Sequence, residues 1–333
     1  GLIPGAFPHG ASLMDGLPAS LSQSLILFLL LAVGFVARKT RVLGDESIRG
    51  LSRFILDFSL PALVLISMQK PFTADVRDQA LRVLGMSALA YALSFPLAYL
   101  VTAAYKGTDS KRVGVHRFAL CFSNVGFMGF PVAESILGPE SLFMVAVYNI
   151  PFQILAFSVG AALIRGPSPR PPSPAKGSGG RFLRVLKPFM NPAVASALLG
   201  FALFLLSARI PEPVYGALDI LGHTTTPLAM AVIGAVLGGT SLSGVLSDWR
   251  LWVTSGWRLA VHPLLIYVFA RALGLSGIEL AVPVLITAMP VAANTTILAG
   301  VYGGDTVSAS ALVFVSTVLS LASIPALGFL LGL

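Results

Sequence analysis

The chain has 333 residues, of which 56% are hydrophobic and 11% are charged, whereas about 25% are charged in an ordinary soluble domain. This composition indicates a polytopic membrane protein and excludes an ordinary soluble domain. The net charge of +8 does not indicate nucleic-acid binding, because the basic residues lie between apolar segments rather than on one face. A single cysteine, Cys121, excludes a disulfide framework or a thiolate metal site within one chain, and we predict no metal or cofactor.

We predict ten membrane-spanning helices, five on each side of a linker. Residues 1–13 lack the basic segment of a signal peptide, and we expect them to be an artificial leader ahead of Met14 or a disordered N-terminus. Residues 166–187 are rich in Pro and Gly and form the predicted linker. The expected spans are at about 20–36, 54–68, 83–105, 115–137, 142–164, 188–206, 218–237, 251–273, 278–301 and 308–330.

Two of these spans, the fourth and the ninth, carry helix-weakening residues in the middle. The fourth contains two glycines and Pro131 within Ser123–Pro131, and the ninth contains Pro290 within Met289–Thr296. Proline has no N–H and crowds the carbonyl four residues earlier, and unpaired backbone groups are not tolerated against lipid. We therefore expect two discontinuous helices that cross near the bilayer centre, where many secondary transporters hold their substrate.

The two halves, residues 14–165 and 188–333, resemble each other. Glycines and prolines recur at a nearly constant spacing in matching spans: Gly34 with Gly200, Pro61 with Pro227, and Pro96 with Pro263. Because five is an odd number, the second repeat would enter the membrane from the opposite side. Of the 22 lysines and arginines, 17 then fall on the linker side and 5 on the other. This places the linker in the cytoplasm and both termini outside, and we expect the cell (inner) membrane.

Residues that could bind a substrate cluster at the two breaks. No metalloprotease, nucleophile-elbow or P-loop motif occurs, so we predict that the protein is not an enzyme. Amide side chains and the N-termini of half-helices favour a carboxylate. The alternative is that these polar groups only satisfy each other's broken backbone. The predicted substrate-binding residues are Asn124, Val125, Pro131, Pro290, Asn294 and Thr295, with Tyr148 and Asn149 in the fifth span as further candidates or as partners in interhelical hydrogen bonds.

A second group of candidates is ionisable. Asp57, Glu134 and His223 lie in predicted spans, where ionisable residues are usually functional, and they are possible members of a proton relay. The alternative for Asp57 and His223 is a position near a helix end, in contact with water. Arg258 and His262 are four residues apart and share a helix face. We interpret Arg258 as a positively charged anchor on the linker side.

The residues around the breaks resemble those of the auxin efflux carrier family. The stretch Asn124–Pro131 followed by Leu-Gly at 137–138 is similar to the family's fourth-helix pattern, and Ala288-Met-Pro290 is similar to its ninth-helix counterpart. The resemblance implies the fold of the bile-acid and sodium/proton antiporter superfamily. It also implies a homodimer with a scaffold of helices 1, 2, 6 and 7 and a transport domain of helices 3–5 and 8–10. After Pro290 the chain departs from the plant carriers, which favours a simpler carboxylate than indole-acetate.

These observations together predict an all-α integral membrane protein with two inverted five-helix repeats. Its expected function is secondary transport of a small organic anion by an elevator-type movement, with a carboxylate substrate, membrane lipid and a second copy of the chain as partners and no nucleic acid. Two alternatives remain. A cation/proton antiporter on the same fold would need carboxylates at the crossing, and a membrane ligand sensor would bind without transport.

Overall fold

The computed structural model describes residues 19–166, 192–239 and 247–331, and in these ranges the regular structure is helical. The predicted N-terminal segment 1–13 and the linker residues 167–187 lie outside the described residues. The first-half helices are α1 (Ala19–Lys39), α2 (Asp45–Phe54), α3 (Leu60–Ser67), α4 (Ala74–Thr102), α5 (Ser110–Cys121), α6 (Phe130–Leu137), α7 (Ser141–Leu155) and α8 (Ala161–Arg165). The second-half helices are α10 (Pro192–Leu205), α11 (Val214–His223), α12 (Thr225–Gly239), α13 (Trp249–Gly256), α14 (His262–Ala272), α15 (Gly277–Thr287), α16 (Thr295–Tyr302) and α17 (Thr306–Leu331).

Several described helices are long and apolar enough to cross a membrane. They are Asp45–Ser67, Ala74–Thr102, Val214–Gly239 and Thr306–Gly328, and shorter apolar helices include Val125–Leu137 and Gly277–Thr287. A helix rises about 1.5 Å per residue, so about 20 residues span the hydrocarbon core. The prediction of an all-helical fold is confirmed for the described part of the chain, and the length and composition of these helices are consistent with a membrane protein.

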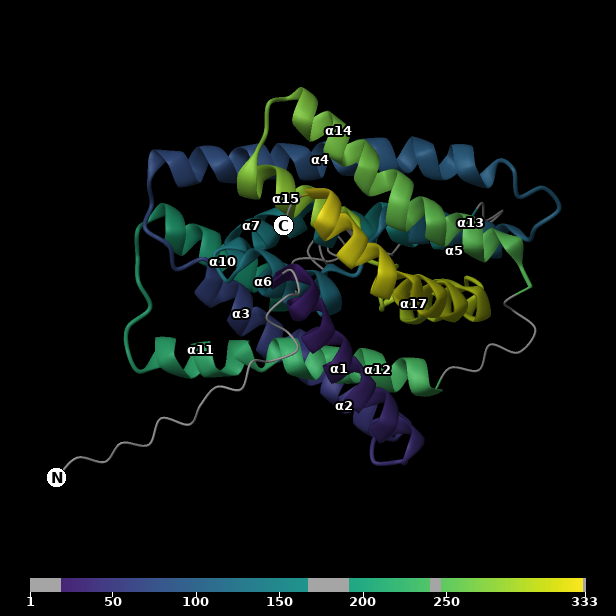
Figure 1. The fold of residues 1–333 in the computed structure, drawn as a ribbon, viewed down its shortest axis with the longest axis horizontal. Coiled ribbons are helices and arrows are strands. Elements are labelled where there is room, and N and C mark those ends of the chain that lie inside the picture. The colour runs from purple at the N-terminus through teal and green to yellow at the C-terminus, as the bar shows by residue number, and fades with distance from the viewer. Residues whose placement is uncertain (1–18, 167–191, 240–246, 332–333) are drawn as a thin grey trace, which may run out of the picture.

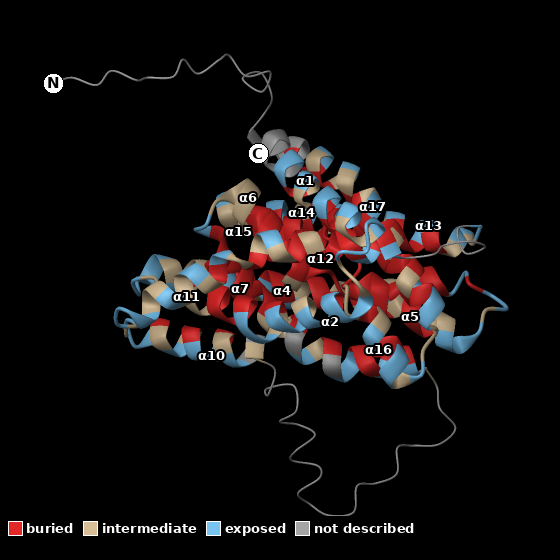
Figure 2. Ribbon diagram, turned by 90° about the horizontal axis from the view of Figure 1, so that it is seen from below, coloured by how far each residue is buried: buried red, intermediate tan, exposed pale blue. Residues whose placement is uncertain are grey.

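The half-helices lie in the middle of the fold. In Figure 1, α4 crosses the upper part of the molecule and α11 and α12 cross the lower part, with α3, α6, α7, α10 and α15 between them. Buried residues concentrate in this middle region, and exposed residues gather toward the periphery (Figure 2). The half-helices of the two broken segments therefore lie where the protein shields them from its surroundings.

Prolines shift the helical register without ending the helix. The π-helical turns Ile55–Ser59, Val125–Gly129 and Trp257–Val261 each end two residues before a proline, and the residue that precedes the proline bonds to the carbonyl five residues earlier. Proline has no N–H to donate and crowds the carbonyl four residues back. A single π turn absorbs this mismatch and lets the helix continue.

Helices α1 and α12 cross at very short range because both carry glycine at the contact. A Cβ added at Gly34 would lie 1.9 Å from the backbone oxygen of Ala231, and one added at Gly234 would lie 1.8 Å from that of Leu31. Any side chain would push the helices apart, as at small-residue contacts between membrane helices. Helices α10 and α11 both pack against α3.

Candidate functional site

The two predicted breaks meet and pair with each other. After α5 the residues Phe122–Asn124 leave the helix, and after α15 the residues 288–294 do the same. The backbone N–H of Asn124 donates to the oxygen of Pro290 (2.8 Å), and that of Ala292 donates to the oxygen of Phe122 (3.2 Å). Ser123 and Val291 thus form an isolated antiparallel bridge. The meeting of the two broken segments, predicted from the sequence, is confirmed.

The position of the first break differs from the prediction. The interruption precedes the two glycines and Pro131, which lie in the continuous helical stretch formed by the π turn Val125–Gly129 and α6. The proline is accommodated by the π turn, so it does not break the helix. The reason for assigning the break to Pro131 was therefore wrong, and Pro131 lies about two turns beyond the crossing.

Most backbone amides of the first break have partners within the break. The N–H of Val125 donates to the oxygen of Ser123 (2.9 Å), and that of Phe127 donates to Oδ1 of Asn124 (3.4 Å). Asn124 therefore caps the half-helix that it begins. No described residue accepts a hydrogen bond from the N–H of Gly126, and this N–H lies at the positive end of the half-helix. A Cβ at Gly126 would contact Leu60 and Leu56 of the neighbouring helix at 3.4 and 4.0 Å.

The second break carries the matching half-helix start. Oγ1 of Thr295 donates to the oxygen of Ala292 (2.5 Å), and the oxygen of Asn294 accepts from the N–H of Leu298. Oδ1 of Asn294 is buried and has no partner among the described residues. Since the oxygen and nitrogen of an amide are assigned rather than observed, the unpaired group is either an acceptor or a donor. In both cases Asn294 has hydrogen-bonding capacity left for a ligand.

A buried arginine donates hydrogen bonds to the C-terminal ends of the two half-helices that precede the breaks. Arg258 is 1% exposed, and its guanidinium donates to the oxygen of Leu120 (Nη1, 3.1 Å) and to that of Met289 (Nε, 3.3 Å). These carbonyls lie at the C-terminal ends of α5 and α15, which carry partial negative charge. Nη1 also contacts Nδ1 of His262 (3.0 Å), and Nε2 of this histidine contacts Oγ of Ser94 (2.9 Å). The interpretation of Arg258 as a positively charged anchor on the linker side is wrong, because the residue is buried at the crossing.

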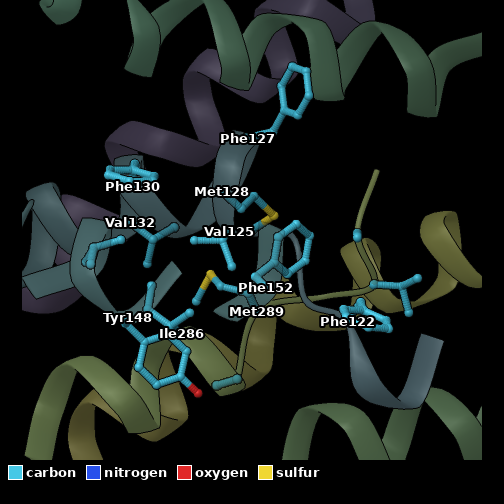
Figure 3. Close-up of a cluster of buried hydrophobic side chains, with 14 of the residues drawn as sticks. Phe122, Val125, Phe127, Met128, Phe130, Val132, Tyr148, Phe152, Ile286 and Met289 are labelled. Atoms are coloured by element: carbon cyan, nitrogen blue, oxygen red, sulfur yellow. The ribbon is translucent and has the colours of Figure 1, made fainter. Parts of the chain in front are cut away.

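Apolar side chains surround the crossing. Figure 3 shows Phe122, Val125, Met128 and Met289 gathered around the two breaks, and Phe122 packs against Phe152 with ring centroids 5.7 Å apart. The surroundings have a low dielectric constant, so charges and helix dipoles interact more strongly there than in water.

The predicted pair on α7 lies near this cluster. Tyr148 stands beside Ile286 (Figure 3), and its backbone oxygen accepts from Oγ of Ser87 (2.7 Å). Asn149 is 7% exposed, and its Oδ1 has no partner among the described residues. The interhelical hydrogen bond weighed as an alternative exists, but it uses the backbone of Tyr148. A substrate contact by either side chain stays a prediction.

The three candidates for a proton relay lie away from the breaks. Asp57 is exposed and makes no ion pair with any described residue, and His223 is exposed and bonds within α11 to Asp219. Glu134 accepts a hydrogen bond from Oγ1 of Thr226 (2.8 Å), which joins α6 to α12. Their role in proton movement stays a prediction.

The sequence interpretation missed the partners that reach the crossing from other helices. Besides Arg258, Oγ of Ser316 on α17 accepts from the N–H of Val291 (3.0 Å). The sequence did contain a signal for the role of Arg258, because an arginine inside an apolar stretch is by default a candidate functional residue. Ser94 and Ser316 had no such signal, since serines inside membrane helices commonly bond to their own helix.

Comparisons with known proteins show the family of the chain. The family described as "Membrane transport protein" matches residues 19–174 and 180–327. The chain belongs to this auxin efflux carrier-like family. The resemblance stated from the residues around the breaks is thereby confirmed, and the match runs through both halves of the chain.

Relatives carry the same broad description. An "Uncharacterized transporter" of Methanothermobacter thermautotrophicus is 29% identical over 304 residues, which are 90% of this chain and 95% of the relative. A "Putative malonate transporter" of Rhizobium meliloti is 26% identical over 313 residues, 92% of this chain and 94% of the relative. A further uncharacterized transporter, from Methanocaldococcus jannaschii, is 25% identical over 312 residues, 92% of this chain and 97% of the relative. All three alignments span nearly the full length of the relatives.

Proposed function

We propose that the protein is a secondary transporter of small carboxylate anions and that it binds its substrate where the two broken helices cross. The observation that carries this proposal is the position of Arg258 against the carbonyls of Leu120 and Met289. It determines which partial charges at the crossing are already compensated by the protein and which are left for a ligand.

Four half-helix ends meet at the crossing, two negative and two positive. Each end is equivalent to about half an elementary charge, so the C-terminal ends of α5 and α15 sum to about one negative charge. The guanidinium of Arg258 carries one positive charge and contacts both. The N-terminal ends at Val125 and Thr295 then leave about one positive charge, together with the N–H of Gly126 and the amide of Asn294. This is the arrangement that attracts an anion.

The same arrangement disfavours a cation as cargo. Neither break contains an Asp or Glu side chain, and the place where a cation would neutralise the C-terminal helix ends is occupied by Arg258. A cation/proton antiporter would need carboxylates at this point, as transporters of cations use them. The electrostatics therefore favour the organic-anion alternative.

The name of the Rhizobium relative suggests a first substrate to test. Malonate is a short dicarboxylate, and its second carboxylate would need neutral donors beyond the helix dipoles. Asn124 can supply its amide NH₂, because its Oδ1 is engaged in capping. Asn149 and Asn294 have unpaired amide oxygens that become donors if the amides are flipped.

The proposed transport movement uses the grouping of the helices. We assign α1–α3 and α10–α12 to a dimeric scaffold and α4–α8 and α13–α17 to a moving transport domain, in ten spans that form two inverted repeats. In support, Ser59 and Thr225 are 166 residues apart, the spacing of the sequence repeat, and their hydroxyls are in contact (2.6 Å). Gly126 faces Leu56 and Leu60 across the boundary between the two groups, so the substrate site lies at this boundary. The linker is assigned to the cytoplasm and both termini to the outside of the cell membrane.

Uptake of labelled malonate by liposomes containing the purified protein tests the proposal. Asn124→Asp is the decisive variant, because aspartate caps a helix as well as asparagine does but places a negative charge beside the anion. It should fold normally and lose uptake, and Asn124→Ala should also lose uptake. Ser158→Ala serves as a control, since this exposed hydroxyl bonds only within its own helix.

Each outcome has a distinct meaning. Normal uptake by Asn124→Asp would refute the site, and absence of uptake of malonate and of other short carboxylates by the wild type would refute the function. Binding of malonate without flux would favour a sensor. A rise in melting temperature with the ligand reports binding separately from flux.

A further inference from the structure

A second buried polar cluster lies on the linker side of the crossing, around His116 of α5. His116 is 0% exposed, and its Nδ1 lies 2.7 Å from Oγ1 of Thr254 on α13. The same hydroxyl lies 2.8 Å from Oη of Tyr105, which donates to the backbone oxygen of Arg250 (3.4 Å). Nε2 of His116 is buried and has no partner among the described residues.

The hydrogen-bond chain determines which nitrogen of His116 carries the proton. If Oη of Tyr105 donates to Arg250, it can accept from Thr254, whose Oγ1 then accepts from Nδ1–H of His116. Every donor in this chain has an acceptor, and Nε2 is left as a bare lone pair. The reverse direction would bury an unpaired N–H and leave the Arg250 oxygen without this donor, which costs more. His116 therefore presents a nitrogen lone pair without a hydrogen-bond partner in the described part of the chain.

This nitrogen lies between the crossing and a group of ion pairs that contacts solvent. Thr254 is one helical turn before Arg258 on the same helix stretch, so the cluster adjoins the arginine at the crossing. On the other side, Arg112 pairs with Asp248 (3.1 Å) and lies 3.7 Å from Asp305, and the side chains of Arg112 and Asp305 are about 30% exposed. A proton from the linker side would reach His116 through this group.

Burial has the largest influence on His116 and disfavours a proton on its imidazole. Of the charged groups that face it, Asp248 and Asp305 favour the proton, while Arg112 and Arg250 oppose it. Three other arginines of the neighbouring elements have partners elsewhere: Arg117 contacts Thr102 and the Tyr99 ring, Arg165 the Tyr302 ring, and Arg258 the crossing. Lys106 and Lys111 are exposed. An added negative charge nearby would favour the protonated imidazole.

We infer that His116 is a proton-binding site that couples proton movement to the anion at the crossing. This inference rests on the proposed function, because the bound carboxylate supplies the additional negative charge. Nε2 accepts the proton through its lone pair, and the proton returns to water when the anion leaves, so no other reactant is needed. His262 does not serve this role, because both its nitrogens are engaged and one faces the guanidinium of Arg258.

The strength of the coupling follows from distance. Six residues of helix separate His116 from Phe122, where the break begins, which is about 9 Å along the axis, so an anion at the half-helix N-termini lies at least about this far away. Two unit charges at that distance, at an effective dielectric constant of about 20, change an equilibrium constant by up to about twentyfold. Linkage requires that the anion strengthen proton binding and that the proton strengthen anion binding by the same factor.

The test compares malonate affinity across pH in wild type and His116→Gln, with the full chain in detergent. Malonate itself titrates in this range, so the informative quantity is the ratio of the two affinities at each pH. We expect a ratio near one at pH 8 that rises as the pH falls, with about twentyfold as its upper limit. Asp248→Asn, which keeps the histidine but removes a charge that favours its proton, should move this rise to lower pH.

In liposomes with an entrapped pH dye, malonate entry should acidify the lumen more with wild type than with His116→Gln.

A constant ratio of affinities and equal acidification by the two proteins would overturn the inference while leaving malonate binding, and hence the proposed function, intact. Loss of the pH dependence in His223→Gln, with His116→Gln behaving as wild type, would also overturn it and would assign the proton to His223. If His116→Gln does not fold, Asp248→Asn decides, because an unshifted pH dependence in that variant is incompatible with a proton on His116.

Discussion

Replacing Arg258 by methionine tests the electrostatics of the crossing. Methionine is similar in length and apolar, so it fills the space but leaves the oxygens of Leu120 and Met289 and Nδ1 of His262 without their donor. Hydrogen bonds to a charged group are worth about 1.5–3 kcal/mol each, which gives a gross loss of about 4–9 kcal/mol. Removal of the buried charge also relieves a desolvation penalty of several kcal/mol. We therefore expect a net loss of about 2–4 kcal/mol in the free energy of unfolding.

The anion should be affected independently of stability. A ligand at the N-terminal half-helix ends lies on the order of 8 Å from the guanidinium, and at an effective dielectric constant of about 20 the attraction is about 2 kcal/mol. Arg258→Met should therefore raise the Kd for malonate about thirtyfold. Arg258→Lys keeps the charge but cannot reach both carbonyls in the same geometry. Arg258→Lys should retain most of the affinity for malonate and should lose about half as much free energy of unfolding as Arg258→Met loses.

The single cysteine supplies the stability assay. Cys121 is 2% exposed and follows Leu120 directly at the end of α5, so a thiol-reactive dye reports opening of the crossing itself during a thermal scan. Arg53→Met is the matched control, since Arg53 is exposed on α2 and should change stability by less than about 0.5 kcal/mol. Wild-type stability and affinity in Arg258→Met would refute the assignment of the guanidinium as the counter-charge of the helix ends.

Two further predictions concern packing and pH. Gly234→Ala should prevent the close crossing of α1 and α12 and make Cys121 reactive at lower temperature. The control is Gly85→Ala, whose added Cβ meets nothing within 4 Å and which should stabilise α4 by about 0.5–1 kcal/mol. Equal effects of the two substitutions would contradict the packing argument. Burial raises the pKa of Asp248, but hydrogen bonds from Arg250 and the charges of Arg112 and Arg250 outweigh it and hold the pKa below the usual aspartate range. This carboxylate then contributes stability that is present above about pH 4 and is lost as the pH falls through its folded-state pKa. Asp248→Asn keeps the helix cap but loses the ion pairs with Arg112 and Arg250, so it should remove about 0.5–1 kcal/mol at pH 7 and much less near pH 3, as measured by the same thiol assay.

The backbone of the site could be predicted from the sequence because its signals are local. An apolar run reports a membrane helix, and a Pro or Gly within it reports a weakened one. The break after α15 occurs where Met289 and Pro290 indicated it. The break after α5 was predicted for the wrong reason, because the sequence does not reveal that a π turn absorbs Pro131. Local propensity therefore located the broken segments, although not the residue at which each helix ends.

The side chains that complete the site could not be predicted in the same way. Arg258 reaches Leu120 across 138 residues of sequence, and His116 reaches Thr254 across the same separation. Both contacts exist only because α5 and α13 pack together. A sequence pattern contains no information on which helix faces meet. Arg258 and His116 were therefore either misinterpreted or left without a role.

The same division between local and tertiary signals applies to the charge of the proposed substrate. Broken helices alone provide two positive and two negative ends, which suit an anion and a cation equally well. The choice depends on which pair of ends the protein compensates itself. Arg258 comes from outside both broken segments and contacts the C-terminal ends. The proposed preference for an anion therefore rests on a third helix, because the helix dipoles of the two breaks alone would leave both kinds of cargo open.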